Sequence, residues 1–379
     1  YLIKKTMEKN KKYIALLIMI LTQSLMFGQS NNFAEKVSTY IELPKDTLLL
    51  GEPAFFNYVL KNNSDESIYV EEGGDYRSGR KISFNVYIIS SDNDTLKKRE
   101  LWGAMGGRIG FHEIKAKESR KFKLFLPMWG DIERADNYKL SVSKKFRIAK
   151  SNPFLSRKTN YDNTEIVPKE SSILLPVIDN QEELGNFIYE MIEDIKEETK
   201  GRVIEGPGFK TGERTYKPMS ERLAEYLRII HELKDDRIVP FLIDCYNNNE
   251  YFTRNRAINY LSRYPNNENV LEVLIDASNG ADNSKYEIFE DSISISWSSD
   301  YTRQVALLSI MKFKDEKAIN YLVSKNDDDF PHERYMILIR AKFLMSEEDR
   351  LRIYHAFEDD EHLAVVKKAK EELELMNKE

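Results

Sequence analysis

The stretch FTRNRA at residues 252–257 decides the fold of the second half of the chain, because it recurs as YTRQVA at residues 301–306. The triplet LID also occurs twice, at 242–244 and at 274–276, a spacing of 32 residues. A repeat of this length fits a unit of two packed helices. The two arginines Arg254 and Arg303 are 49 residues apart, so an insertion of about 17 residues is expected near 279–300.

Apolar residues around this repeat follow the 3.6-residue period of a helix, which begins after Gln181 with Leu184, Ile188 and Ile195 on one face. Helix pairs are expected at 218–248, 251–278, 301–325 and 331–357, with a last helix at 362–376. Residues 181–379 are therefore predicted to fold as a short all-α stack, whose end copies are atypical.

These units resemble HEAT-type repeats, and the match is best at Asp244, Arg254, Ala257 and Leu261. In that family a terminal Asp of one helix and an early Arg of the next usually tie neighbouring units together. The resemblance implies a structural role for Asp244 and Arg254, and an α-solenoid surface that is suited to binding a polypeptide.

Residues 39–178 follow a different pattern, with a period of two and many β-branched and aromatic residues. Turn residues such as Gly51-Glu52-Pro53 separate the runs. Strands are predicted at 39–43, 54–61, 67–71, 82–90, 95–101, 110–115, 120–126 and 137–146. Strands of this number form a β-sandwich, which we place at 36–178 with a C-terminal linker included.

Two segments of the sandwich resemble immunoglobulin-like domains of exported bacterial proteins. LLGEP at 49–53 with YVLKNNS at 58–64 resembles their opening hairpin, and NYKLSV at 137–142 resembles the strand that carries their corner tyrosine. The resemblance implies that the Tyr138 hydroxyl bonds to upstream backbone. The whole chain resembles HEAT-like repeat proteins with an N-terminal immunoglobulin-like domain, of the kind found among exported Bacteroidetes proteins.

Residues 1–30 are typical of an export signal. Three lysines within residues 9–12 precede an apolar run at 14–21, and Gly28 and Ser30 offer the small residues that a signal peptidase accepts. We expect translation to start at Met7, residues 1–6 to precede the start, and cleavage near Ser30. The alternative is an uncleaved anchor, although the run is shorter than the roughly 20 apolar residues that span a bilayer. No Cys lies near Ser30, so a lipoprotein is not expected.

This signal predicts a periplasmic or extracellular protein with no integral membrane segment after cleavage. The part at 181–379 has 28 basic and 41 acidic residues, a net charge of −13, whereas 31–180 has a net charge of +3. An acidic domain repels phosphate backbones, so no nucleic-acid partner is expected, and a cationic or neutral partner fits better. The single cysteine, Cys245, lies in an apolar run and is expected to be buried.

The longest breaks in the helical pattern are 201–217 and 279–300, and both precede the first helix of a unit. The acidic turns 326–329 and 358–361 leave the stack at the same edge in the predicted register. Acidic residues also favour helix starts for purely structural reasons, which is the alternative interpretation. The predicted binding residues at this edge are Tyr286, Phe289, Trp297, Asp327, Asp328, Asp359 and Asp360.

Two tryptophans of the sandwich, Trp102 and Trp129, lie beside glycine-containing bends, where each ring either stacks on a sugar or closes the core. His332-Glu333 lacks the second histidine of a metalloprotease helix, and no nucleophile elbow is present, so no catalytic residue, metal or cofactor is predicted. The sequence favours a non-enzymatic interaction protein that binds a protein or peptide. The alternatives are a glycan-binding or cell-surface protein that acts through the sandwich, and an uncharacterised hydrolase or hydrolase inhibitor.

Overall fold

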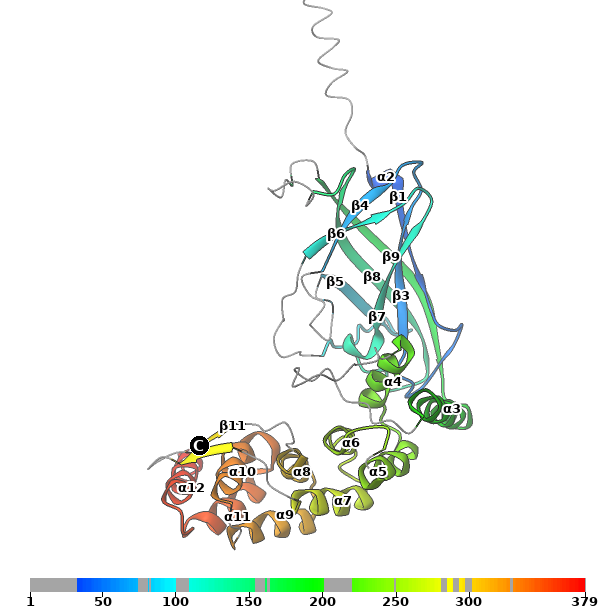
Figure 1. The fold of residues 1–379 in the computed structure, drawn as a ribbon. Helices are drawn as coiled ribbons and strands as arrows, with labels where there is room; N and C mark the ends of the chain where they lie inside the picture. Colours follow the sequence, from blue (N-terminus) through cyan, green and yellow to red (C-terminus); the bar gives the residue numbers. More distant parts are fainter. Residues whose placement is uncertain are drawn as a thin grey trace, which may run out of the picture. The chain divides into compact units, whose positions relative to one another are not determined.

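The computed structural model describes residues 33–73, 81, 83–99, 109–153, 161, 164–200, 220–248, 250–280, 285–288, 293–296, 302–327 and 330–378. The chain forms two compact units, Tyr1–Asp179 and Asn180–Glu379 (Figure 1). The first is built of strands and the second of helices, so the predicted fold class of a β-rich region followed by a helical region is confirmed. The predicted export signal at 1–30 lies outside the described residues.

The first unit is a sandwich of two sheets, preceded by the short helix α2 (Phe33–Lys36). The smaller sheet is antiparallel, with the strand order β1 (Val37–Glu42), β3 (Phe55–Asn62), β7 (Ser119–Phe125). The larger sheet has the order β2 (Leu48–Leu49), β9 (Thr164–Ile178), β8 (Asp136–Ala149), β4 (Ile68–Gly73), β6 (Ile109–Ile114), and β5 (Phe84–Ile89) also pairs with β8.

The core of the sandwich contains an aromatic cluster, which we define as Tyr58, Phe84, Phe122 and Phe146. The ring of Phe122 lies 5.6 Å from the rings of both Phe84 and Phe146, and Tyr58 stacks on Phe146 at 6.1 Å. All four side chains are buried. Aromatic rings at these separations attract one another in addition to the area that they remove from water, so this cluster holds the two sheets together.

The tyrosine corner that the sequence predicts is confirmed. The Tyr138 hydroxyl donates to the carbonyl oxygen of Arg134 at 3.1 Å, and the ring is buried. Burial raises the pKa of the Tyr138 hydroxyl. The bond links the start of β8 to the chain that enters it, and so fixes the crossover between the sheets.

Two predictions about strands are wrong. Residues 95–99, the described part of the strand expected at 95–101, form no strand, and only Thr95 bridges to Ile89. The expected linker contains β9, which pairs with β8 along the whole length of β8. Its two prolines, Pro168 and Pro176, weaken the strand signal, but β2 pairs only with the last residues of β9. Proline is tolerated there because few backbone N–H groups of this edge are needed for pairing.

The second unit is a stack of helices, and the predicted helix pairs are confirmed to within a few residues. Side-chain oxygens of Asn180, Ser220, Thr253, Asp315 and Ser346 accept backbone N–H bonds and set five helix starts. The helices are α3 (Gln181–Thr199), α4 (Glu221–Glu232), α5 (Val239–Asn248), α6 (Arg254–Leu261), α7 (Glu268–Ser278), α8 (Thr302–Ile310), α9 (Glu316–Val323), α10 (Pro331–Leu344), α11 (Glu347–Phe357) and α12 (Leu363–Met376).

The helices from α5 onward lie in two rows. One row consists of α6, α8, α10 and α12, each packed on the next, and the other consists of α5, α7, α9 and α11. Ion pairs cross the second row: Glu272 with Lys317 between α7 and α9, and Glu316 with Arg352 at 2.7 Å between α9 and α11. Cys245 is buried inside the stack, as predicted. Among the described residues, no helix has the length and apolar character needed to cross a membrane.

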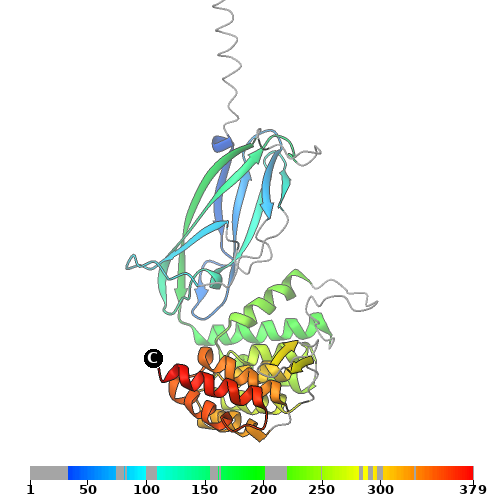
Figure 2. The ribbon, with the colours of Figure 1, turned by 90° about the vertical axis from the view of Figure 1, so that its left-hand side faces the viewer.

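A β-hairpin lies within the insertion predicted at 279–300. Its strands are β10 (Lys285–Ile288) and β11 (Ile293–Ser296), which pair antiparallel. β11 packs against α10, and Figure 2 shows the yellow hairpin beside the orange and red helices. The insertion therefore adds a small sheet to one side of the helical stack.

Candidate functional site

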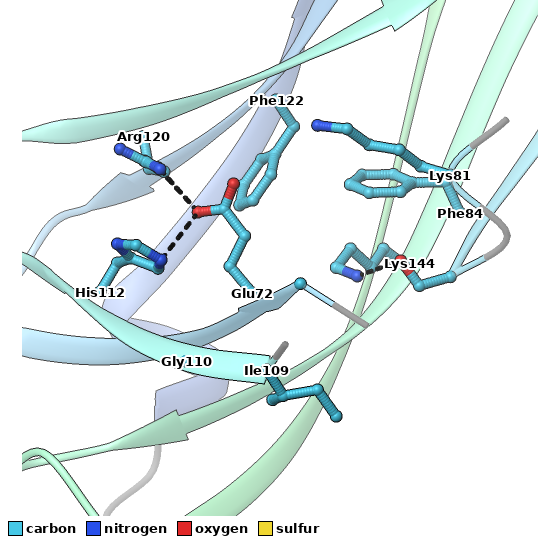
Figure 3. Close-up of a pocket in the computed structure, with 11 residues that line it drawn as sticks. Glu72, Lys81, Phe84, Ile109, Gly110, His112, Arg120, Phe122 and Lys144 are labelled. Carbon is cyan, nitrogen blue, oxygen red and sulfur yellow. Dashed lines mark hydrogen bonds and ion pairs between the residues drawn. The ribbon is translucent and has the colours of Figure 1, made fainter. Parts of the chain in front are cut away.

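The sandwich contains a pocket at a fork in the larger sheet. One edge of β8 is occupied by β9 over residues 136–149. The other edge is shared, because β5 pairs with residues 139–144 and β4 pairs with residues 148–149. The strands β4 and β5 therefore separate from each other along β8, and a cavity of about 340 Å³ opens between them (Figure 3).

The floor of this pocket belongs to the aromatic cluster of the core. Phe84 comes from β5 and Phe122 comes from β7 in the opposite sheet, so the cavity reaches through one sheet to the other. Ile109, at the start of β6, adds an apolar side chain that is 49% exposed at the pocket wall. The base of the pocket can therefore contact the apolar part of a ligand.

The walls of the pocket carry charged side chains of both signs. Among the described residues of the lining, three side chains are cationic, Lys81, Arg120 and Lys144, and one is a carboxylate, Glu72. In Figure 3, Lys81 and Lys144 lie together with Phe84, and Glu72 lies between them and the pair Arg120 and His112.

The carboxylate of Glu72 is engaged within the pocket wall. One of its oxygens, Oε2, accepts two bonds from the Arg120 guanidinium, at 2.7 Å and 3.1 Å. The Nε2 atom of His112 lies 3.9 Å from the same oxygen. The charge of Glu72 is thus balanced by Arg120.

Lys144 is held over the aromatic floor. Its ammonium group lies 4.4 Å from the centre of the Phe84 ring and 5.6 Å from that of Phe146, and it donates to the Ser83 hydroxyl at 2.8 Å. The negative face of an aromatic ring attracts a cation at this distance. These contacts fix where the positive charge of Lys144 lies, directly above the apolar base.

The helical unit uses its buried charges differently. Arg303, at the start of α8, pairs with Glu333, at the start of α10, and both side chains are almost completely buried. Arg334 of α10 pairs with Asp360, which precedes α12, with Nε 2.6 Å from Oδ2. These pairs connect helices of successive units, and they occupy arginine positions that recur in the sequence. Their geometry is that of internal cross-links rather than of a binding site.

The resemblance to HEAT-type repeats singled out Asp244 and Arg254, which have other contacts in this structure. Asp244 accepts from the Asn248 amide, and the guanidinium of Arg254 lies over the Tyr246 ring at 5.7 Å. The connecting role that we expected for these two residues is filled by the pairs at Arg303 and Arg334, one and two units further along the stack.

Three predicted binding residues are described together with their side chains. Trp129 is 3% exposed and packs in the sandwich core. The side chain of Asp360 is buried against Arg334, whereas Asp359 is exposed at the α11–α12 turn. Tyr286 lies in β10 and Asp327 in the short helix η3 (Ser324–Asp327). Outside the described residues lie Trp102, Phe289, Trp297 and Asp328.

The residues of the pocket were not predicted. Those that the structure describes come from five strands, β4 to β8, and from Lys81 and Ser83, which precede β5, and in the strands they occur as ordinary members of an alternating pattern. The only local signal is Lys144, a charged residue two positions before the buried Phe146. Their convergence is a property of strand order and register.

Comparisons with known proteins give no family. No family model matches the chain, and no curated protein matches it. Among solved structures, the CARDB domain of a Pyrococcus furiosus protein in complex with di-metal ions is 12% identical, with a TM-score of 0.18 over 38% of this chain and 87% of that one. The PapD-like domain 7 of human CEP192 is 12% identical, with a TM-score of 0.20 over the same shares.

A third similar structure is native alpha-2-macroglobulin from Escherichia coli, from its domain MG7 to its C-terminus. It is 9% identical, with a TM-score of 0.20, and the match covers 90% of this chain and 55% of that one. Scores this low carry no weight for the fold, which rests on the strand order, register and helix packing described above.

Proposed function

We propose that this chain is an exported, non-enzymatic interaction protein that docks a polypeptide partner on the edge of its helical unit. The observation that carries the proposal is the hairpin β10–β11, an insertion in the repeat that packs on α10. In repeat proteins, insertions within single units cluster on one face, and this face is often the one that binds. The remainder of the stack would then serve as the rigid support of the hairpin.

The helices beside the hairpin are connected by two buried ion pairs. The pairs Arg303–Glu333 and Arg334–Asp360 hold the starts of α8 and α10 and the turn before α12 in register, next to the strand β11 that packs on α10. A docking surface on such a frame loses little conformational freedom on binding. We assign the units to the HEAT type on the two rows of helices and the recurring arginines.

The chemistry of the proposed partner follows from charge and from the hairpin itself. The buried ion pairs are neutral overall, so the net charge of −13 within 181–379 resides on the other residues. At the α11–α12 turn, Asp359 is exposed and the Glu361 side chain is 82% exposed. Within the described residues the hairpin is a two-stranded sheet, whose outer edges an extended peptide can join by backbone hydrogen bonds. A cationic, extended polypeptide segment meets both conditions.

Export is part of the same proposal, and it rests on the lysines and the apolar run within residues 7–30. The glycan-binding alternative requires exposed rings of both Trp102 and Trp129. Because Trp129 is packed in the core, it has no free face for a sugar. No contact among the described residues favours a hydrolase or an inhibitor of one over the interaction protein.

The test removes the hairpin and measures capture of partners from the native periplasm or medium. Replacing residues 282–299 by a short Gly-Ser linker removes four carboxylates and one lysine, a change of three negative charges. The matched control is Glu190→Gln, Glu193→Gln and Glu197→Gln on the exposed face of α3, which removes the same charge. We expect the deletion to abolish capture and the control to retain it, with equal ellipticity at 222 nm. Capture of the same partners by the deletion variant would refute the proposal.

A further inference from the structure

We infer that Asn279 is a positioning residue for the docking hairpin, because it fixes the point at which the insertion leaves the helical stack. The inference rests on the function proposed above, since it concerns how the same hairpin is presented to a partner. It assigns a role to side chains that lie outside the hairpin and that the repeat pattern did not single out. The contacts that carry it come from three other elements, α8, α9 and η3.

The start of the insertion is held by side chains of the next unit. Asn279 and Gly280 follow Ser278, the last residue of α7, and stand at the start of the insertion. The Oδ1 atom of Asn279 accepts from the Tyr321 hydroxyl at 2.7 Å and from the Nζ atom of Lys325 at 3.2 Å. The oxygen of the same hydroxyl lies 2.6 Å from Oγ of Ser278. Because Tyr321 belongs to α9 and Lys325 to η3, these bonds connect the end of α7 to the unit that follows the insertion.

The two donors to Asn279 are themselves held in place. Lys325 is only 5% exposed, and its Nζ atom lies 4.9 Å from the centre of the Tyr321 ring. A buried lysine has already lost most of the rotational freedom of its long side chain on folding. The donor site that these two side chains form for Asn279 is therefore fixed in the folded chain, and it adds no ordering cost when a partner docks.

The two ends of the insertion meet at Arg303, in the first turn of α8. Its guanidinium donates to the carbonyl oxygen of Gly280 at 2.9 Å, and the same group donates to a carboxylate oxygen of Glu333 at 2.8 Å. Glu333 lies at the start of α10, the helix on which β11 packs. The base of the insertion and the hairpin are therefore attached to the same helix.

Bonds at the base of the insertion matter because a two-stranded hairpin has little stability of its own. When the start of the insertion is fixed, fewer arrangements of the hairpin compete with the one that packs on α10. When the start frays, locally opened forms become more populated although the helices stay folded. Loss of the bonds to Asn279 should therefore open the hairpin and leave the stack intact.

The experiment measures the rate at which trypsin cleaves the native full chain after Lys285, with the products identified by mass spectrometry. Lys285 is the first residue of β10, and it is the only lysine or arginine between Arg263 and Arg303. A paired strand must open before a protease can cleave it, so the rate reports the population of opened hairpin. We expect Asn279→Ala and Tyr321→Phe each to increase this rate by roughly fivefold or more, the usual effect of losing one or two hydrogen bonds. The ellipticity of the helices should not change.

Two further variants separate positioning from a general loss of packing. Asn279→Asp keeps acceptor oxygens for both donors, so it should be cleaved at the rate of the unaltered chain. The matched control is Asn248→Ala at the end of α5, where the amide donates to Asp244 of its own helix, and it should also leave the rate unchanged. The inference is overturned if Asn279→Ala is cleaved no faster than the unaltered chain, or if Asn279→Asp or Asn248→Ala is cleaved as fast as Asn279→Ala. It is also overturned if the unaltered chain is cleaved as fast as a free peptide with the sequence of residues 279–303.

The cleavage assay contains no partner, so it fails or succeeds separately from the docking proposal. If the hairpin deletion still captures the same partners while Asn279→Ala speeds cleavage, the docking function is refuted and the fixed base of the insertion stands. If the deletion abolishes capture while Asn279→Ala leaves the cleavage rate unchanged, the hairpin docks the partner but Asn279 does not position it.

Discussion

Replacement of Glu333 by leucine tests whether the buried pair Arg303–Glu333 holds the helical stack together. The Glu333 side chain is 0% exposed and that of Arg303 is 7% exposed. After the replacement, the guanidinium would keep the Gly280 carbonyl at 2.9 Å and the Phe330 ring at 4.3 Å, but it would lose the carboxylate of Glu333. Breaking a buried pair from one side destabilises a protein by about 3–5 kcal/mol. Glu333→Leu is therefore expected to lower the free energy of unfolding of the helical unit by that amount.

A double variant distinguishes the energy of the Arg303–Glu333 interaction from the effect of changing each side chain alone. Arg303→Met combined with Glu333→Leu removes both charges and fills the site with apolar atoms, and such replacements are often neutral or stabilising. The destabilisation of the double variant should therefore be smaller than the sum of the two single destabilisations by about 3 kcal/mol or more. The control is Arg352→Met, which breaks an exposed pair with Glu316. The side chain of Arg352 is 36% exposed and that of Glu316 is 70% exposed. This control should lose only about 0.2–1 kcal/mol.

The assay is urea unfolding followed by ellipticity at 222 nm, which reports mainly on the helical unit. With a slope of about 2 kcal/mol per molar urea, a loss of 3–5 kcal/mol lowers the midpoint by about 2 M. If Glu333→Leu moves the midpoint no further than Arg352→Met, the pair is not a cross-link of the stack. The same conclusion holds if the double variant is as unstable as the sum of the two single variants.

Three further predictions concern buried hydroxyl and thiol groups. Tyr138→Phe removes the corner bond to Arg134 and should destabilise the sandwich by about 1–2 kcal/mol, measured by urea unfolding monitored through tryptophan fluorescence. Burial raises the pKa of Tyr260 to about 12, so its contribution to the stability of the helical unit is complete below pH 10 and is lost as pH rises toward 12. Ellipticity at 222 nm recorded from pH 8 to 12 should fall with rising pH, and less so in Tyr260→Phe. Burial also raises the pKa of the Cys245 thiol to about 12, so a disulfide reagent at pH 8 should label it only after urea is added; rapid labelling of the native chain would contradict the buried position.

The helical unit was the easier part to predict from the sequence, because each helix carries its own signal. The apolar face of α3 repeats within a single segment, and residues such as Ser220 and Thr253 mark helix starts by their capping oxygens. The strand β9 shows the opposite case. It contains two prolines, and its partner β8 is identified only once the register is known, so its sequence alone did not separate it from a linker.

The candidate pocket lay beyond sequence reasoning for a related reason. A fork in a sheet arises when two strands share one edge of a third, as β4 and β5 share β8, and no local pattern encodes this arrangement. In the sequence, Lys144 has the pattern of a solvent-facing member of an alternating strand, and Lys81 is an ordinary polar residue before one. For Trp129 the sequence left open whether the ring binds a sugar or closes the core, because a large ring beside a glycine can do either, and the structure places it in the core.

The two units place charge under different physical constraints, and this difference separates structural from functional candidates. In the helical unit the buried arginines Arg303 and Arg334 each face a buried carboxylate, so these ion pairs stabilise the packing of the helices. A ligand at those positions would have to break a pair that is itself needed for folding. In the sandwich, the pocket residue Glu72 is engaged by Arg120 while its side chain stays 25% exposed, and Lys144 lies over the apolar floor. Partly exposed charge at a pocket, rather than buried charge that is needed for folding, is therefore the better candidate for a functional role in this protein.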